Sequence, residues 1–181
     1  MFILRPSIMH IHISFPRTTD HESEHGMDRL NHMYFKRRKE VKTWCCLNEA
    51  QCNTMVKEIP NFTCLIRDEK AKIIWYTELF PSNISTMQNF IDGKIDETGL
   101  YKLSFKLKPH QIEGIYISMM VLDKAYRRKG IMLRAVKKQL TPYIKKYKHL
   151  GLFTWPYSNA GRGCSERIAK DLHMKLYIKG H

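Results

Sequence analysis

The sequence has no apolar run near the roughly 20 residues that a membrane-spanning helix requires. Its longest apolar run, residues 115–122, has the length of a buried strand. The first residues lack a clean apolar core and a small-residue cleavage site, so they do not fit a secretory signal peptide. We therefore expect no transmembrane segment and no membrane partner.

Cysteines are few and follow no disulfide framework. The chain has five cysteines in 181 residues, and two of them, Cys45 and Cys46, are adjacent. An odd count without framework spacing favours reduced thiols in a cytosol. The nine histidines are scattered, and no cysteine or carboxylate completes a set with recognised metal-ligand spacing. These patterns predict a cytoplasmic protein without a metal.

Acidic residues are scarce compared with basic ones. The chain has 17 Asp and Glu against 31 Lys and Arg, a formal net charge of +14. A charge of this size implies attraction to an anion, such as a nucleotide cofactor, a nucleic acid or an acidic surface. Much of it lies in residues 36–42 and 127–148. Because a lysine-rich helix face is also an ordinary solvated surface, the charge permits phosphate binding without establishing it.

The length suits one domain with a proper core. Residues 1–27 are polar in their second half, which predicts an irregular N-terminal extension. Residues 28–181 are expected to form a single α/β domain. In its first part, residues 28–57 have apolar positions spaced as on one face of a helix.

Hydrophobic periodicity and turn signals predict further elements after Pro60. Strands are expected over residues 61–67, 72–80, 114–122, 150–155 and 174–178, and a weak alternation suggests another over 100–108. Helices are expected over residues 86–91, 131–147 and 165–172. Pro81 is expected to stop the second strand. The run 114–122 is apolar on both faces, as in a central strand covered on both sides.

A basic connection, residues 123–130, joins that central strand to the following helix. A helix N-terminus presents unpaired N–H groups and the positive end of its dipole. Gly130 would let the backbone approach an anion closely, and Arg127, Arg128 and Lys129 add positive charge. This constellation suits a pyrophosphate. The same pattern also occurs in ordinary strand-to-helix turns with basic surface residues.

Residues 122–131, LDKAYRRKGI, resemble the acetyl-CoA motif of the GNAT acetyltransferases, in which an aromatic residue precedes Arg/Gln-x-x-Gly-x-Gly/Ala. Arg127 stands at the first position of this motif and Gly130 at its glycine. Met132 stands where the family usually has Gly or Ala. On these residues the chain is similar to the GNAT superfamily.

The flanking sequence extends the resemblance to about residues 60–178. Downstream, Asn159 follows a strand, and a helix leads to His173-Met174 at the position of the family's Gly-Phe pair. Upstream, the hairpin resembles the family's second and third strands, with Trp75 where a glycine is common.

The resemblance implies a GNAT-like mixed, mostly antiparallel central sheet, flanked by helices and with splayed central strands. It implies transfer of an acetyl group from acetyl-CoA, the co-substrate, to an amine that attacks it directly. The implied acetyl-CoA-binding residues lie on the splayed strand, the basic loop and the next two helices: Met120, Val121, Leu122, Arg127, Arg128, Lys129, Gly130, Ile131, Met132, Asn159 and Ser165.

The resemblance also suggests catalytic residues. Tyr116 matches a position where some members carry a catalytic Glu, although a tyrosine on a buried strand is usually part of the core. Glu113 and Glu78 are candidate bases acting through a water, although each is also typical of a solvated strand end. The tyrosine that many members use as an acid falls at Ala169, so that acid is absent.

The sequence leaves the acceptor and two alternative functions open. The acceptor amine could belong to a small molecule, a peptide or an RNA-linked group. The sequence has one strand fewer than is common in the family, which would leave a sheet edge exposed and favour a homodimer. The alternative functions are a basic RNA-binding module, suggested by the charge and the interleaved aromatics, and a catalytically degenerate GNAT fold that binds CoA.

Overall fold

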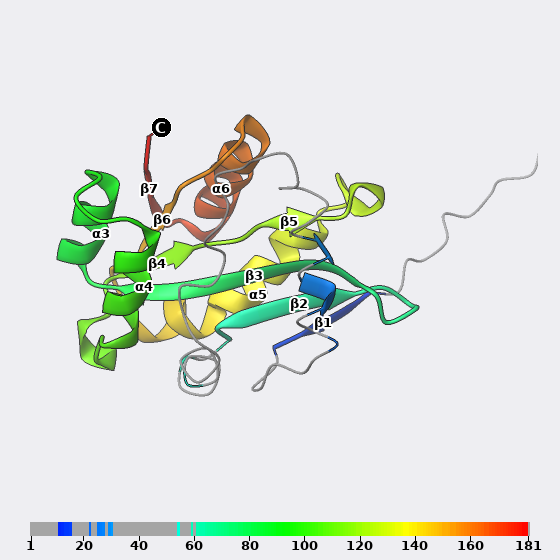
Figure 1. The fold of residues 1–181 in the computed structure, drawn as a ribbon, viewed down its shortest axis with the longest axis horizontal. Coiled ribbons are helices and arrows are strands. Elements are labelled where there is room, and N and C mark those ends of the chain that lie inside the picture. Colours follow the sequence, from blue (N-terminus) through cyan, green and yellow to red (C-terminus); the bar gives the residue numbers. More distant parts are fainter. Residues whose placement is uncertain are drawn as a thin grey trace, which may run out of the picture.

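The computed structural model describes residues 11–15, 22, 25–27, 29–30, 54, 59 and 61–180. Its centre is a twisted sheet that runs the length of the molecule (Figure 1). Within this part of the chain the sheet has seven strands: β1 His12–Ser14, β2 Thr63–Arg67, β3 Ile73–Ser82, β4 Gly114–Ile117, β5 Val121–Leu122, β6 Gly151–Thr154 and β7 Lys175–Ile178.

The strands are ordered β1-β2-β3-β4-β6-β7, and β5 continues alongside β3. Every pairing from β1 to β5 is antiparallel. The pairings of β4 with β6 and of β6 with β7 are parallel. The expected mixed, mostly antiparallel sheet is therefore confirmed.

Three of the four α-helices with defined limits in the described chain begin at a capping side chain. The four helices are α3 Ile84–Ile91, α4 Glu97–Phe105, α5 Ile131–Lys146 and α6 Asn159–Leu172, with short 3₁₀ turns at Pro109–Gln111 and Lys124–Tyr126. Asn83, Asp96 and Ser158 each accept a backbone N–H of the first turn of α3, α4 and α6 respectively. Such caps satisfy donors that the start of a helix leaves unpaired.

The two faces of the sheet carry different helices. Ile115 of β4 packs with α5 and α6 residues such as Val136 and Ile168. Its neighbour Tyr116 packs with Phe90 of α3 and with Leu100 of α4. Because successive residues of a strand point to opposite faces, α5 and α6 cover one face, and α3 and α4 lie against the other.

The strand expected over residues 100–108 is wrong, because α4 occupies most of this segment. The side chain of Asp96 accepts a hydrogen bond from Gly99 N, which starts the helix. Leu100 and Ser104 are its buried residues, and their spacing of four places them on one helical face. The weak alternation of the sequence obscured this spacing.

The expectation that Pro81 stops the second strand is also wrong, since β3 continues to Ser82 and Pro81 pairs with Ile115. Glu113 N donates to Ser82 O. Backbone groups alternate in direction along a strand, so those of Pro81, the residue before Ser82, point away from β4. On that side β2 makes its last pair with β3 at Thr63, opposite Glu78, and does not reach Pro81. A proline there removes no ladder hydrogen bond.

The remaining expected elements are present, with shifted limits. Part of the segment expected to be irregular is the edge strand β1, which pairs His12 with Arg67 and Ser14 with Leu65. Helix α6 begins at Asn159, six residues before the expected start at Ser165. The helical prediction for residues 28–57 falls almost entirely outside the described residues, and the domain limits stay a prediction.

Candidate active site

A β-bulge interrupts the central strand that the sequence predicts. β4 pairs with β3 as far as Leu79 opposite Ile117, and β5 resumes with Tyr76 opposite Val121. Two β3 residues, 77 and 78, lie between these pairs, against the three residues 118–120 on the other strand. The extra residue makes a bulge, which bends a strand and increases its twist.

The bulge coincides with a fork between two parallel strands. β4 and β6 pair from Gly114 opposite Gly151 to Tyr116 opposite Phe153. Thr154 Oγ1 then donates to Ile117 O at 3.1 Å, which ties the base of the fork. Beyond this point β5 pairs with β3 only, within the described chain. The central strands therefore splay at residues 118–122.

The free edge of β5 presents backbone polar groups to the fork. Asp123 N donates to Ile74 O of β3 at 2.9 Å. Because backbone groups alternate along a strand, Leu122 and Met120 face the fork, and Val121 faces β3. Nε of Arg127 donates to Leu122 O at 3.3 Å, on this open side.

The basic loop leads directly into the N-terminus of α5. Gly130 has a left-handed backbone with φ of 67°, and a Cβ there would meet no atom within 4 Å. Among the described residues no side chain caps α5, and its first turn has no acidic residue. Arg128 and Lys129 are exposed beside it. An open helix start with adjacent cations has the physical features that favour an anion.

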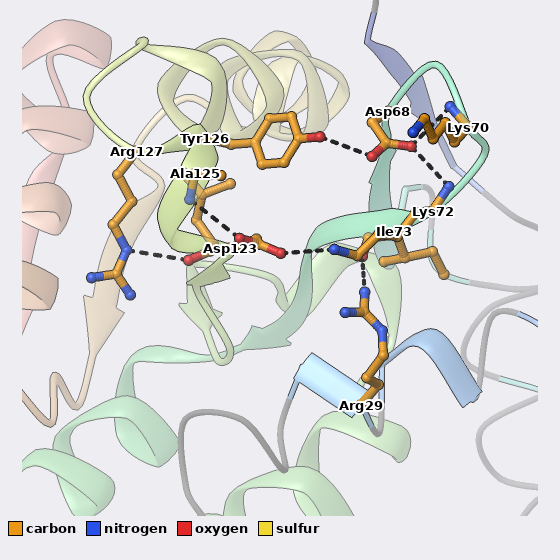
Figure 2. Close-up of polar contacts among 10 residues, drawn as sticks. Arg29, Asp68, Lys70, Lys72, Ile73, Asp123, Ala125, Tyr126 and Arg127 are labelled. Carbon is orange, nitrogen blue, oxygen red and sulfur yellow. Dashed lines mark hydrogen bonds and ion pairs between the residues drawn. The ribbon is translucent and has the colours of Figure 1, made fainter.

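Two contacts anchor the loop to the β2–β3 hairpin (Figure 2). The hydroxyl of Tyr126 donates to Asp68 Oδ2 at 2.8 Å. Nζ of Lys72 lies 3.1 Å from Asp123 Oδ2, while Ala125 N donates to Asp123 Oδ1 at 3.2 Å. The loop is thus held at its start and in its 3₁₀ turn.

The electrostatics of these carboxyls fit their contacts. Burial disfavours ionisation of Asp123, but the hydrogen bonds from Lys72 and Ala125 outweigh it and hold the pKa of this carboxyl below its ordinary value. Asp68 follows the same balance: the hydrogen bond from Tyr126 helps to lower its pKa against the effect of burial. Both carboxylates are therefore stabilised as anions.

The other residues expected to bind acetyl-CoA occupy different surroundings. The sulfur of Met132 lies 4.0 Å from Sγ of Cys164, so this side chain is directed toward α6. Ile131 is buried and Asn159 is exposed at the first turn of α6. Ser165 is fully buried, and its hydroxyl donates to Gly161 O at 3.1 Å within α6.

The three candidate catalytic residues do not meet at one place. Glu78 lies opposite the bulge, and Ser118 N donates to its carbonyl at 3.1 Å. Tyr116 lies two residues before Ser118, in the core. Glu113 stands at the other end of β4, where its carboxylate accepts the backbone N–H of Ile84 at 2.9 Å. The structure therefore brings Tyr116 and Glu78 near the fork, and Glu113 about 16 Å along the strand from Ser118.

Sequence reasoning missed a carboxylate beside Tyr116. The hydroxyl of Tyr116 donates to Oε1 of Glu97 at 2.5 Å. Burial, and then the negative charge of Glu97, raise the pKa of Tyr116 well above its ordinary value. Glu97 belongs to α4, which the sequence did not predict as a helix. The signal that could have located it is the capping residue Asp96 before Glu97.

The described residues contain neither a metal-binding group nor a membrane-spanning helix. No group of three or more His, Cys, Asp or Glu side chains is arranged to hold a metal ion there. None of the helices in this part of the chain combines the length and apolarity that a bilayer crossing requires.

No protein-family model and no curated protein matches this sequence. Solved structures do match. The loading GNATL domain of CurA from Lyngbya majuscula aligns with a TM-score of 0.54 at 10% identity, over 79% of this chain and 63% of that one. The chain thus spans less than two thirds of that structure's length.

Two acetyltransferases are also similar. The mosquito arylalkylamine N-acetyltransferase like 5b aligns with a TM-score of 0.51 at 14% identity, over 90% of this chain and 82% of that one. Diaminobutyrate acetyltransferase EctA from Paenibacillus lautus, solved with L-2,4-diaminobutyric acid and coenzyme A, has a TM-score of 0.47 at 13% identity, over 90% and 76%. Together with the forked mixed sheet, the matches above a TM-score of 0.5 show that this chain has the fold of the GNAT superfamily.

Proposed function

We propose that this protein is an N-acyltransferase that transfers an acetyl group from acetyl-CoA to an amine. The observation that carries the proposal is the continuity of two features. A strand edge at Met120 and Leu122, which pairs with no other strand in the described chain, leads through the basic loop to the open N-terminus of α5. The first feature suits an amide-containing arm, and the second suits a pyrophosphate.

The residues fit the two ends of acetyl-CoA. Backbone N–H groups of the first α5 turn, with Arg128 and Lys129, would hold the pyrophosphate. The backbones of Met120 and Leu122 would pair with the amide arm, as an added strand pairs with a sheet edge. Met132 leaves this surface clear, because its sulfur contacts Cys164. Asn159, exposed at the start of α6, is a further polar group on the other side of the fork.

The proposed chemistry requires positioning and two proton transfers. The amine nitrogen attacks the thioester carbonyl carbon, a C–N bond forms and the C–S bond breaks. The nitrogen loses one proton to a water held by Glu78, and the departing thiolate takes one proton from solvent. Tyr116 acts by position, since its hydroxyl is engaged with Glu97 and its raised pKa disfavours ionisation.

We also propose a cytoplasmic location and a homodimer. The cysteine pattern supports a cytoplasmic location, where thiols remain reduced. Within the described chain β7 pairs with β6 only, so its outer edge is a surface at which a homodimer could form.

The first test is titration of the purified protein with acetyl-CoA by calorimetry. We expect micromolar binding by the wild type and at least tenfold weaker binding by Arg128→Glu. Lys145→Glu is the matched control, because it changes charge equally about 21 Å further along α5. A folded wild-type protein that binds no acetyl-CoA would overturn the proposal.

The second test separates an enzyme from a CoA-binding fold without catalysis. Release of free CoA thiol is followed with acetyl-CoA and a panel of primary amines, some of them RNA-linked. Acetylated amine formed in step with the thiol supports the transferase. Binding of acetyl-CoA without turnover of any amine would favour the degenerate fold.

A further inference from the structure

The carboxylate of Glu97 lies among three tyrosine hydroxyls. Its Oε1 accepts from Tyr116 at 2.5 Å and from Tyr101 at 3.2 Å. Among the described residues its Oε2 has one, longer contact, 3.5 Å to the hydroxyl of Tyr157. Because a carboxylate oxygen accepts about two hydrogen bonds, Oε1 is satisfied and Oε2 retains acceptor capacity.

This group spans the mouth of the fork. Tyr116 is the last β4 residue paired with β6, and Tyr157 follows β6 by three residues. Tyr101 also lies 3.3 Å from Oγ of Ser118, in the bulge. Glu97 itself comes from α4, on the sheet face opposite α5. A molecule at Oε2 would therefore reach the fork from the face opposite the basic loop.

Glu97 and Glu78 give this place negative charge. Among the described residues no Lys, Arg or His forms an ion pair with Glu97. Glu78 adds a second negative charge, since it contributes to the raised pKa of Tyr101. Glu97 is half-buried and the ring of Tyr157 is exposed, so solvent-borne groups have access.

Aromatic rings beside the carboxylate already hold one ammonium group. Nζ of Lys179 lies 4.1 Å from the ring centroid of Phe90 and 4.9 Å from that of Trp155. The ring of Trp155 is tilted against that of Tyr157, with centroids 5.2 Å apart. Because Lys179 occupies the ring faces of Phe90 and Trp155, an external ammonium group would contact the Glu97 carboxylate and the exposed ring of Tyr157. A carboxylate beside an aromatic ring is an arrangement that recognises organic cations.

We propose that Glu97 is the specificity-determining residue for the acceptor, and that its Oε2 binds the ammonium group of a cationic primary amine. This ammonium group loses one proton to solvent before its neutral nitrogen attacks the thioester, and the second proton leaves during the attack as described above. The inference rests on the proposed function and names its substrate class. The helical segment between β3 and β4 thus supplies the acceptor-binding carboxylate of Glu97, while the N-terminus of α5 supplies the binding groups for the pyrophosphate of acetyl-CoA. Acceptors with an acidic group next to the amine are excluded by the charge of Glu97 and Glu78.

The test compares an amine with its uncharged isostere. Binding of 2-phenylethylamine and of 2-phenylethanol to the full chain is measured by NMR titration at neutral pH. We expect the wild type to bind the amine at least tenfold more tightly, and Glu97→Gln to lose this preference. Gln keeps an oxygen acceptor for Tyr116. Glu166→Gln, an exposed change of equal charge on α6, is expected to keep the preference.

Each outcome decides the proposal. A wild type without preference for the amine, or a folded Glu97→Gln variant that retains it, would overturn the role of Glu97. Where turnover is measured, KM for the amine is expected to rise about tenfold in Glu97→Gln with a smaller change in kcat. A merely structural role would instead lower the melting temperature and leave the preference intact. If the proposed function itself is wrong, the wild type will bind no acetyl-CoA, and this result differs from a failure of the Glu97 proposal alone.

Discussion

Tyr116→Phe removes one hydroxyl from the core without changing the shape of the ring. The ring of Tyr116 packs against Phe90 and Phe153 at centroid distances of 5.1 and 5.2 Å, and these contacts persist in the variant. The lost interaction is a partly buried hydrogen bond to the carboxylate of Glu97. A hydrogen bond to a charged group contributes about 1.5–3 kcal/mol. We expect the free energy of unfolding to fall by about that amount.

The assay is urea denaturation followed by circular dichroism, with a thermal scan beside it. For a chain of this length about 1 kcal/mol corresponds to roughly 2–4 °C, so the melting temperature should fall by about 3–12 °C. Tyr177→Phe is the matched control, since its ring packs on the same sheet face and its hydroxyl has no hydrogen bond within the described part. Its stability should change by less than about 0.5 kcal/mol.

A double-mutant cycle with Glu97→Gln assigns the effect to this pair. Residues in direct contact show coupling free energies of about 0.5–3 kcal/mol, and we expect about 1 kcal/mol because Gln still accepts the hydroxyl in part. A loss below about 0.5 kcal/mol in Tyr116→Phe, or additive single effects, would refute the inference that the Glu97 contact stabilises this face of the sheet.

Three further predictions concern the loop and the core. Gly130→Ala should lower the free energy of unfolding by about 1 kcal/mol, because an alanine is strained in the left-handed conformation of this residue. It should also weaken acetyl-CoA binding. Denaturation measures the first effect and calorimetry the second. Asp123→Asn should lower stability by about 0.5–1 kcal/mol at neutral pH. Because the pKa of Asp123 is lowered by folding, this difference should be constant above the ordinary pKa of about 4. It should decline below that value and be lost once pH has fallen through the lowered pKa of the folded state, which a pH series of melts would detect. Cys64 should resist iodoacetamide at pH 8, because burial raises its pKa to about 12; peptide mapping reads its labelling.

Each of these has a contrary result. Unchanged stability and unchanged binding in Gly130→Ala would show that neither the backbone conformation nor the open helix start matters. A stability difference for Asp123→Asn that persists at pH 2 would exclude the charged contact with Lys72 as its cause. Rapid alkylation of Cys64 in the folded protein, at the rate seen in urea, would contradict its burial.

The basic loop was predictable because its signal is local. A strand, a run of cations, a glycine and a helix follow one another within residues 114–146, and each is set by neighbours in the chain. The left-handed conformation of Gly130 agrees with the residue type found there. The β2–β3 hairpin was found for the same reason: its turn chemistry and strand pattern are contiguous.

The elements that were missed depend on partners distant in the sequence. Pro81 remains in β3 because β2 ends before it, which the residues around Pro81 do not encode. The bulge at residues 118–120 arises from a mismatch between two strands about 40 residues apart. The register between two strands cannot be read from the periodicity of either strand alone.

By itself the sequence determined the mixed α/β class, the hairpin, and the strand-loop-helix unit with its positive charge, since these follow from residue type and short spacing. Only the tertiary structure decided that a bulge divides the central strand into β4 and β5, that Met132 lies against Cys164, and that Glu113 is far from the fork. It also brought Glu97 to Tyr116, 19 residues away, and to Tyr157, 60 residues away. Both contacts form because α4 packs on the sheet. This packing depends on the shape of the folded sheet, which no short stretch of the sequence contains.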